Sequence, residues 1–250
     1  MAGNDSERIA YIAGITGSIG SDLAQRLTKS GWTVAGIARD ADKIAKLKES
    51  LGITCAQANC TDAEAVNAAF EQLEQSVGTP TAYIHAVGSI ILKPGHQTKD
   101  DEWHETINLN LNSAFYGLRA AVKAMKQGGS IVLISSTAAQ VGLPSHEAIA
   151  AAKGGVEALA RSAAATYAGK NLRVNSVALG LIDSNMSQPI VGSEMGRKVS
   201  EAMHPLGRIG QPADATSLIA YLISDEATWV SGQSWAVDGG LSKLRQKPKV

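Results

Sequence analysis

The chain has 250 residues, of which 44% are hydrophobic and 18% are charged, a composition typical of a folded globular protein and unlike that of a disordered or fibrous one. Its 23 basic and 23 acidic side chains cancel, so no overall field attracts nucleic acid or an anionic membrane. We therefore expect a small-molecule substrate and neither a nucleic acid nor a membrane as partner.

The thiols and histidines suggest neither a disulfide nor a metal site. Cys55 and Cys60 are the two cysteines, and their spacing suits neither a disulfide framework nor a zinc site, so we expect reduced thiols. The five histidines also lack the spacing of metal ligands, which predicts no metal. Because the N-terminus has no apolar core and no run reaches ~18 apolar residues, we expect a cytoplasmic protein.

Short β-branched runs alternate with longer amphipathic stretches along the chain. Strands are predicted at 9–13, 33–38, 53–56, 82–87, 131–134 and 173–178. Helical patterns begin near Ser18, Ala41, Ala63, Lys99 and Ser145. Strands that are apolar on both faces and alternate with helices predict a parallel sheet between two helical layers. The fold class is therefore α/β, in a three-layer, doubly wound Rossmann arrangement.

No linker, repeat or low-complexity block interrupts this alternation, so residues 1–250 are predicted to form one nucleotide-binding domain. Residues 183–204 break the rhythm, because they have weak periodicity and contain Pro189, Gly192 and Gly196. Such a stretch is typical of a mobile lid over a site. Its apolar side chains, predicted as walls of that site, are Met186, Ile190, Val191 and Met195. The basic tail, 243–250, is predicted to be a solvated end.

The first predicted strand runs directly into a glycine-rich turn and then a helix. Such a turn lets the backbone approach a pyrophosphate, whose charge meets unpaired amides and the positive end of the helix dipole. The position of the turn in the first strand-turn-helix unit makes the signal specific. The predicted phosphate cradle consists of Gly14, Thr16, Gly17, Ser18, Ile19 and Gly20.

This turn resembles the T-G-x-x-x-G-x-G motif of the short-chain dehydrogenase/reductase family, with Ala13 for the threonine and Ser18 for the middle glycine. It also satisfies the G-x-x-G-x-x-G spacing of other branches of that family. Residues 59–62 are similar to the family's D-V-T-D adenine loop, and residues 85–88 lie where the family has N-N-A-G. The resemblance implies cofactor contacts at Asn59, Cys60, Ala86 and Gly88.

The choice of cofactor is predicted from the end of the second strand. Dinucleotide folds that prefer NAD usually place a carboxylate there, whereas an arginine can pair with the 2′-phosphate of NADP. Ala38 stands at the usual acidic position, and Arg39 follows it. This pattern favours NADP, with NAD as the alternative.

Three segments resemble the family's catalytic centre. Residues 103–111 are similar to its fourth helix, which implies that Asn110 anchors a proton-relay water, with Asn108 and Asn112 as near rivals. Residues 129–136 resemble its fifth strand, which implies that Ser136 binds the substrate oxygen. In the segment 145–155 the resemblance implies that Lys153 holds the ribose. Residues 179–184 are similar to the family's P-G loop, implying nicotinamide contacts at Ile182 and Ser184.

The family signature Y-x-x-x-K is incomplete, because Ile149 occupies the tyrosine position. Three alternatives follow. His146 falls near the face of Lys153 at ~100° per residue and is a competent acid near neutral pH. The chemistry can instead need little acid catalysis, as in reduction of a conjugated C=C bond, with Ser136, Lys153 or water meeting the proton demand. The third alternative is a protein without activity.

Residues 204–212 and 232–240 follow the family's C-terminal pattern, so the resemblance spans nearly the whole chain. It implies a sheet of seven strands and a homotetramer or dimer built through helices 99–126 and 145–168 and the last strand. The leading hypothesis is an atypical oxidoreductase that uses NADP(H) on a small carbonyl or conjugated enone. The alternative is a catalytically silent nucleotide-binding homologue that acts as a regulatory or structural subunit.

Overall fold

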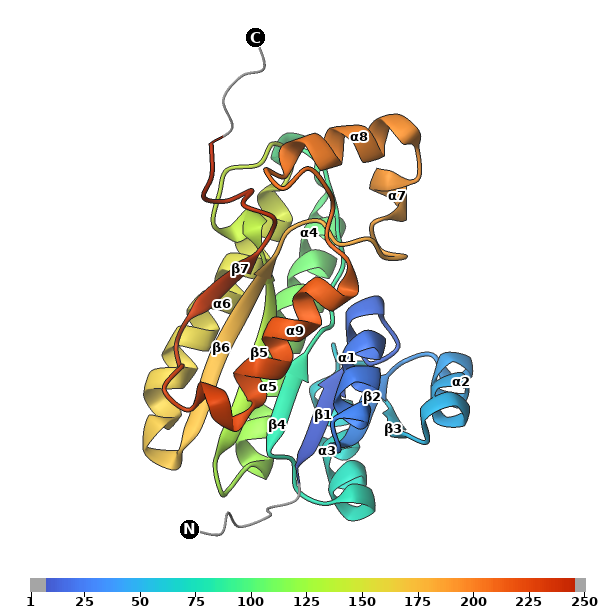
Figure 1. The fold of residues 1–250 in the computed structure, drawn as a ribbon, viewed down its shortest axis with the longest axis vertical. Helices are drawn as coiled ribbons and strands as arrows, with labels where there is room; N and C mark the ends of the chain where they lie inside the picture. Colours follow the sequence, from blue (N-terminus) through green and yellow to red (C-terminus); the bar gives the residue numbers. More distant parts are fainter. Residues whose placement is uncertain (1–7, 246–250) are drawn as a thin grey trace.

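The computed structural model describes residues 8–245, and within them seven strands form one parallel sheet in the order β3-β2-β1-β4-β5-β6-β7 (Figure 1). The strands are β1 (Ile9–Ala13), β2 (Thr33–Ala38), β3 (Thr54–Gln57), β4 (Ala82–His85), β5 (Gly129–Ser136), β6 (Leu172–Leu179) and β7 (Ser234–Val237). The strand order reverses between β1 and β4, the point at which an open parallel sheet forms a crevice beyond its carboxyl ends. The expected seven-stranded Rossmann fold is confirmed.

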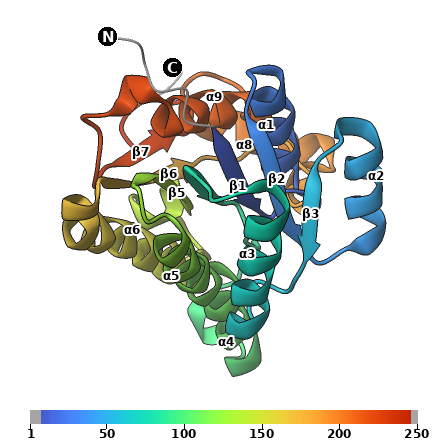
Figure 2. The same cartoon turned by 90° about the horizontal axis from the view of Figure 1, so that it is seen from below.

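Helices cover both faces of the sheet (Figure 2). One layer contains α1 (Ser18–Lys29) and α9 (Pro212–Ile223), and the opposite layer contains α3 (Ala63–Val77), α5 (Ser113–Ala124) and α6 (Glu147–Tyr167). Each layer buries its own apolar cluster against the strands, which explains why the strands are apolar on both faces. The remaining α-helices are α2 (Ala41–Leu51), α4 (Asp100–Ile107), α7 (Gln188–Val191) and α8 (Glu194–Met203).

Several strands begin or end at other residues than predicted. For β4, β5 and β6, the bounds follow from the length over which neighbouring strands pair. β4 stops at His85 instead of residue 87, because β1 ends at Ala13 and the amide of Ala86 makes the last bond, 2.9 Å to the Ala13 carbonyl. β5 and β6 are longer than predicted, because they pair with each other over eight residues. β3 begins at Thr54, one residue later than predicted.

The helix expected over 99–126 is interrupted by a π-helical turn at Asn108–Asn112, a feature frequent at functional sites. A buried polar chain supports this turn. The Ser113 hydroxyl donates to the carbonyl of Leu109 at 2.6 Å, and the ring of His85 bonds Ser113 Oγ at 3.0 Å and the Tyr83 hydroxyl at 2.8 Å. Burial, with Lys153 nearby, lowers the pKa of His85 to about 3.

Residues 183–204 contain regular structure that the prediction missed, since α7 and α8 both lie there. Two contacts fix α8 and the residue that follows it to the loop after β6. Asp183 pairs with Arg197 of α8 at 3.0 Å, and the amide of Leu181 donates to His204 Nε2 at 3.2 Å. The weak periodicity reflects two short helices and not an irregular loop.

Within residues 8–245, no helix combines the length and the apolar character needed to cross a bilayer. Residues 1–7 and 246–250, which contributed to the sequence-based expectations about the N-terminus and the basic tail, lie outside the described residues.

Candidate active site

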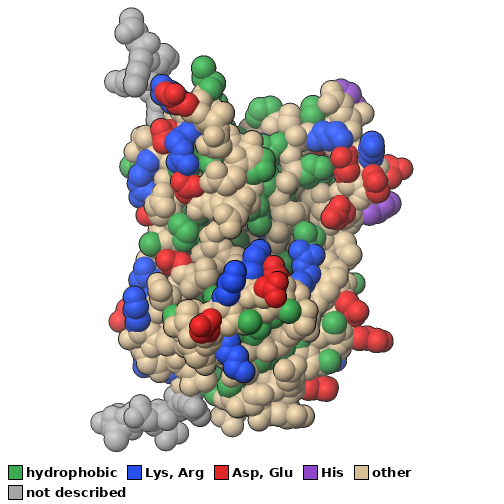
Figure 3. All heavy atoms as spheres, turned by 90° about the vertical axis from the view of Figure 1, so that its right-hand side faces the viewer, with side chains coloured by type: hydrophobic (Ala, Val, Ile, Leu, Met, Phe, Trp, Pro, Cys, Tyr) green, Lys and Arg blue, Asp and Glu red, His purple; other side chains and the backbone are tan. Residues whose placement is uncertain are grey.

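A cavity of about 410 Å³ opens at the carboxyl ends of the strands, between the β1–α1 turn and the loop after β6. A second cavity of about 180 Å³ adjoins it, and the two share lining residues that include Thr16, Arg39 and Gly88. Figure 3 shows one side of the molecule, with hydrophobic side chains in the hollow of its upper half. We call the two cavities together the cleft.

The glycine cradle forms the wall of the cleft at β1 and α1. Gly14 has a φ of +79°, and a Cβ there would lie 2.7 Å from the Ala86 carbonyl oxygen, so only glycine fits. A Cβ on Gly20 would overlap the Gly14 carbonyl. The N-cap of α1, Gly17, provides no side-chain cap, and the first turn carries no acid. The first amides of α1 are therefore open to an anion.

The smaller cavity is lined by Asn59, Cys60 and Arg39, three residues expected at the adenosine end of a dinucleotide. Burial raises the pKa of the Cys60 thiol to about 11, so this side chain is neutral at pH 7. Lys43 also lines the cleft, although the sequence prediction missed it. Asp40 caps α2 by accepting the Lys43 amide at 3.0 Å, and this helix start brings Lys43 to the same end as Arg39.

Asn110, Ser136 and Lys153 all line the larger cavity. Lys153 is 6% exposed, and its Nζ donates to the Ile134 carbonyl at 2.9 Å. Burial lowers the pKa of Lys153 to about 8. Ser136, at the end of β5, accepts the Ala138 amide at 3.2 Å and keeps its own hydrogen to donate.

Asn110 is held rigidly by two neighbours. Its Oδ1 accepts the Ser89 amide at 3.1 Å, and its Nδ2 donates to Ser89 Oγ and to the Thr106 carbonyl, both at 3.0 Å. Gly88 fits between Asn110 and Lys153, because a Cβ there would lie 2.8 Å from Asn110 Oδ1 and 3.2 Å from Lys153 Nζ. The side chains of Asn110 and Lys153 therefore both lie close to Gly88.

Ile149 lines the cleft one turn before Lys153 and is buried. His146 is not among the residues that line it. The His146 ring instead bonds the Pro144 carbonyl at 2.7 Å through Nδ1, at the N-cap of α6. The structure thus brings together three of the four predicted catalytic residues and leaves His146 outside.

Every residue predicted to contact the cofactor lines one of the two cavities, including Ala86, Ile182 and Ser184. Of the four predicted apolar walls, Met186 lines the cleft, whereas Ile190, Val191 and Met195 do not, and Val191 is buried. Further lining residues that sequence reasoning missed lie at the last residues of β5 or in the loops after β4 and β6: Val87, Ser89, Ile90, Ile134, Ser135, Gly180, Leu181 and Asn185. Their position at the carboxyl ends of parallel strands is the signal that could have found them.

The fold and the cleft together define a doubly wound α/β protein whose cleft, at the carboxyl ends of the strands, is lined by a glycine-rich turn, Ser136 and Lys153. A family model described as "Enoyl-(Acyl carrier protein) reductase" matches residues 14–242. The chain is 31% identical to 2-(S)-hydroxypropyl-CoM dehydrogenase 3 of Xanthobacter autotrophicus over 98% of this chain and 100% of that protein. It is 32% identical to the inactive 2-(S)-hydroxypropyl-CoM dehydrogenase 2 of the same organism, over 89% of this chain and 100% of that one.

A third relative, the NADP-dependent (R)-specific alcohol dehydrogenase of Lentilactobacillus kefiri, is 31% identical over 93% of this chain and 96% of its own length. A solved structure, a short-chain type dehydrogenase/reductase from Mycobacterium ulcerans, superposes with a TM-score of 0.91 at 29% identity, covering 96% of this chain and 91% of that one. The chain therefore belongs to the short-chain dehydrogenase/reductase family of oxidoreductases.

Proposed function

We propose that this protein is an NADP(H)-dependent oxidoreductase that acts on a small carbonyl or conjugated enone without the tyrosine acid of its family. One observation carries the proposal: a single cleft contains the glycine cradle, Arg39 and the Ser136–Lys153 pair. The NADP-dependent relative supports this cofactor, and NAD is the alternative.

The residues of the cleft fit a dinucleotide. The cradle amides would bind its diphosphate, and Arg39 and Lys43 would bind the 2′-phosphate of the adenosine ribose. Lys153 would hold the ribose next to the nicotinamide, while Ile182 and Ser184 would contact the carboxamide. When bound, the nicotinamide supplies or accepts hydride. Ser136 donates a hydrogen bond to the substrate oxygen, where negative charge develops during reduction.

The proton that the substrate takes up during reduction needs another donor, because the Ile149 side chain has no acidic group. Lys153 lies in the cleft with a pKa of about 8, which suits a proton donor near neutral pH, and water or Ser136 can share the role. Loss of a dedicated acid slows ordinary ketone reduction by roughly 10²- to 10⁴-fold. A conjugated C=C bond demands less acid catalysis, which is why an enone is included.

A catalytically silent, cofactor-binding subunit is the second candidate. It is favoured by Ile149 in the cleft and by the relative that is described as inactive. For either function we propose a cytoplasmic homotetramer or dimer built through α4, α5, α6 and β7. Phe115 on α5 and Trp235 on β7 are exposed aromatic side chains that such contacts would cover.

Calorimetric titration with NADPH and NADH tests the cofactor assignment, and NADPH oxidation with a panel of ketones and enones tests the activity. We expect NADPH to bind about tenfold or more tightly than NADH, because an arginine–phosphate contact adds a charge-assisted bond. No heat from either cofactor at about 1 mM, a concentration that detects even weak binding, overturns the proposal. Binding without turnover of any compound favours the silent subunit.

A further inference from the structure

The substrate end of the cleft is apolar and uncharged apart from Lys153. Beyond Ser136 and Lys153, the side chains that line it are Ile90, Ile149, Leu181 and Met186, with Ser89 and Asn185 as neutral polar groups. The other basic residues of the lining, Arg39 and Lys43, lie at the dinucleotide end. A bound dinucleotide would already occupy Lys153 and these two cations.

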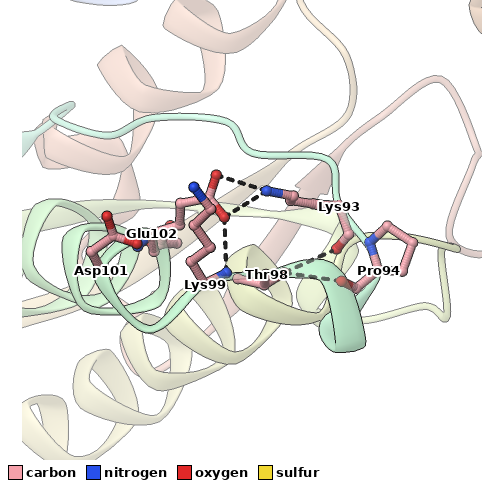
Figure 4. A network of polar contacts seen from close by, with 7 residues as sticks. Lys93, Pro94, Thr98, Lys99, Asp101 and Glu102 are labelled. Carbon is pink, nitrogen blue, oxygen red and sulfur yellow. Dashed lines mark hydrogen bonds and ion pairs between the residues drawn. The ribbon is translucent and has the colours of Figure 1, made fainter.

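A basic side chain on the loop after β4, three residues beyond the lining residue Ile90, is neutralised by an acid. Lys93 follows the exposed residues Ile90 and Leu92, and its Nζ donates to both carboxylate oxygens of Glu102, at 2.8 and 2.7 Å (Figure 4). Glu102 is also fixed by the Lys99 amide at 2.9 Å. The hydrogen bond from Lys93, followed by that amide, holds the pKa of Glu102 below its ordinary value, so the pair stays ionised and has no net charge.

A second cation, Arg197 of α8, is neutralised in the same way. It pairs with Asp183 at 3.0 Å, and Asp183 directly follows the lining residue Ile182. Neither Lys93 nor Arg197 lines the cleft, and each is paired with a carboxylate, so a ligand carboxylate or phosphate would have to displace a protein carboxylate to reach either one.

The borders of the cleft expose apolar side chains. Ile90 and Leu92 are 38% and 41% exposed on the loop after β4. Covering exposed apolar surface at the border of a site with an apolar ligand is favourable, because that surface is removed from water.

We propose that the substrate is an uncharged, largely apolar carbonyl compound, and that the cleft discriminates against substrates with a carboxylate or phosphate near the reacting carbon. The inference rests on the proposed function and adds the substrate class to it. An anion entering this cleft would lose water without gaining a free cation, whereas an apolar group loses nothing.

The test compares methyl 4-oxocyclohexanecarboxylate with 4-oxocyclohexanecarboxylate, two ketones that differ in charge and hardly in shape. Binding to the NADP⁺-loaded protein is measured by calorimetry, and kcat/KM is measured with NADPH. We expect the neutral ester to be favoured by about tenfold or more in both measurements, or ~1.4 kcal/mol. Equal or tighter binding of the acid overturns the inference.

Glu102→Gln frees Lys93 and provides a sharper test. In this variant we expect the ratio of ester binding to acid binding to fall by about 3- to 10-fold, which is the scale of one ion pair at a partly exposed site. Glu105→Gln removes an exposed acid from the same helix and should leave the preference unchanged. A preference that does not move in Glu102→Gln, with the melting temperature retained, overturns the role of the neutralised pair.

The binding measurement separates this inference from the proposed function. If the ester binds preferentially and neither ketone is reduced, the proposed activity fails while the substrate class holds. If both ketones are reduced and the acid reacts as well as the ester, the activity holds and the substrate class is wrong.

Discussion

Ile149 and Lys153 lie one helical turn apart on α6, and both line the same cleft. The lysine is therefore buried beside an aliphatic side chain, and within residues 8–245 no carboxylate pairs with it. Its pKa of about 8 reflects this burial. A buried cation without a carboxylate partner destabilises the fold. The position of Lys153 in the cleft fits a side chain that binds a ligand.

Lys153→Met is expected to stabilise the protein and to weaken cofactor binding. The pKa of Lys153 is lower in the folded chain than its ordinary value of 10.5, so at pH 7 the folded protein holds this proton at a cost. Removing the charge recovers that free energy, and each ~1 kcal/mol raises the melting temperature by roughly 2–4 °C in a chain of this size. NADPH affinity should fall about tenfold or more, because a charge-assisted hydrogen bond is lost.

The pH dependence of the stability difference between the wild type and Lys153→Met tests the direction of this effect. The wild-type penalty is full below about pH 8 and disappears as the pH rises toward 10.5, so the stability difference between the two proteins should shrink over that window. Lys29→Met, at an exposed position, serves as the control and should change neither quantity. A variant that is less stable than the wild type at pH 7 contradicts the argument.

Gly20→Ala is expected to abolish dinucleotide binding, because its Cβ would overlap the Gly14 carbonyl and push α1 away from the cradle. The overlap should also lower stability, by about 1–3 kcal/mol for a packed contact. Fluorescence titration with NADPH and thermal melting measure the two effects. Gly169→Ala adds a methyl where no atom lies within 4 Å, so it should retain full affinity. Retained affinity in Gly20→Ala would show that the diphosphate is not held here.

Arg39→Ala is expected to weaken NADPH binding and to leave NADH binding nearly unchanged. Arg39 lines both cavities at the adenosine end, where a 2′-phosphate distinguishes the two cofactors. An arginine–phosphate contact is strong and bidentate, so we expect a loss of roughly 10- to 100-fold for NADPH. Lys43→Ala should produce a smaller loss in the same direction, because a lysine acts as a point charge. Equal losses for both cofactors would assign Arg39 to some other contact.

Much of the fold was predictable because local signals agree with the tertiary arrangement. β1 and β2 have their predicted bounds, since each is a continuous apolar run that ends at a turn. α2 and α3 begin where expected because Asp40 and Asp62 cap them by accepting amides of the first turn. The cradle was predictable for a related reason, because its residues are adjacent in the sequence.

His146 shows where sequence reasoning failed. The prediction placed it on the face of Lys153 by extending helical geometry back to Ser145. Ser145 has a φ of +63°, which is incompatible with a helix, and α6 begins only at Glu147. His146 is therefore the N-cap, and its ring follows the turn instead of the helix face. Lys43 and Ser89 were missed because their approach to the cleft depends on how separate segments pack.

Tyr83→Phe is expected to destabilise the protein by about 1–3 kcal/mol, the cost of leaving a buried polar atom unpaired. Tyr83 donates to His85 Nδ1, because His85 Nε2 is needed as donor to Ser113, whose own hydrogen goes to Leu109. Chemical denaturation measures the loss. Tyr116→Phe, on a partly exposed hydroxyl, is the control and should have an effect near zero.

His85→Gln should reduce the loss of folding stability that occurs as the pH falls. The folded pKa of His85, about 3, lies below its ordinary value of 6.5, so the unfolded chain takes up this proton first. The neutral ring therefore contributes stability above pH 6.5 that is lost as the pH falls toward 3. Denaturation between these limits should show a shallower decline in the variant. An identical slope would mean that this histidine is protonated in the folded protein.

Ile149→Tyr is expected to create or enhance ketone reduction. The substitution places a phenol one turn before Lys153 in the cleft, where the lysine's charge can lower the phenol pKa and the hydroxyl can donate to the substrate oxygen beside Ser136. A recovered general acid should raise kcat for simple ketones by roughly 10²- to 10⁴-fold, with a smaller gain on enones. Ile149→Phe adds the ring without the hydroxyl and should give no gain, which separates proton donation from packing. If the tyrosine and phenylalanine variants react at the same rate while both still bind NADPH, the missing phenol is not what limits this enzyme.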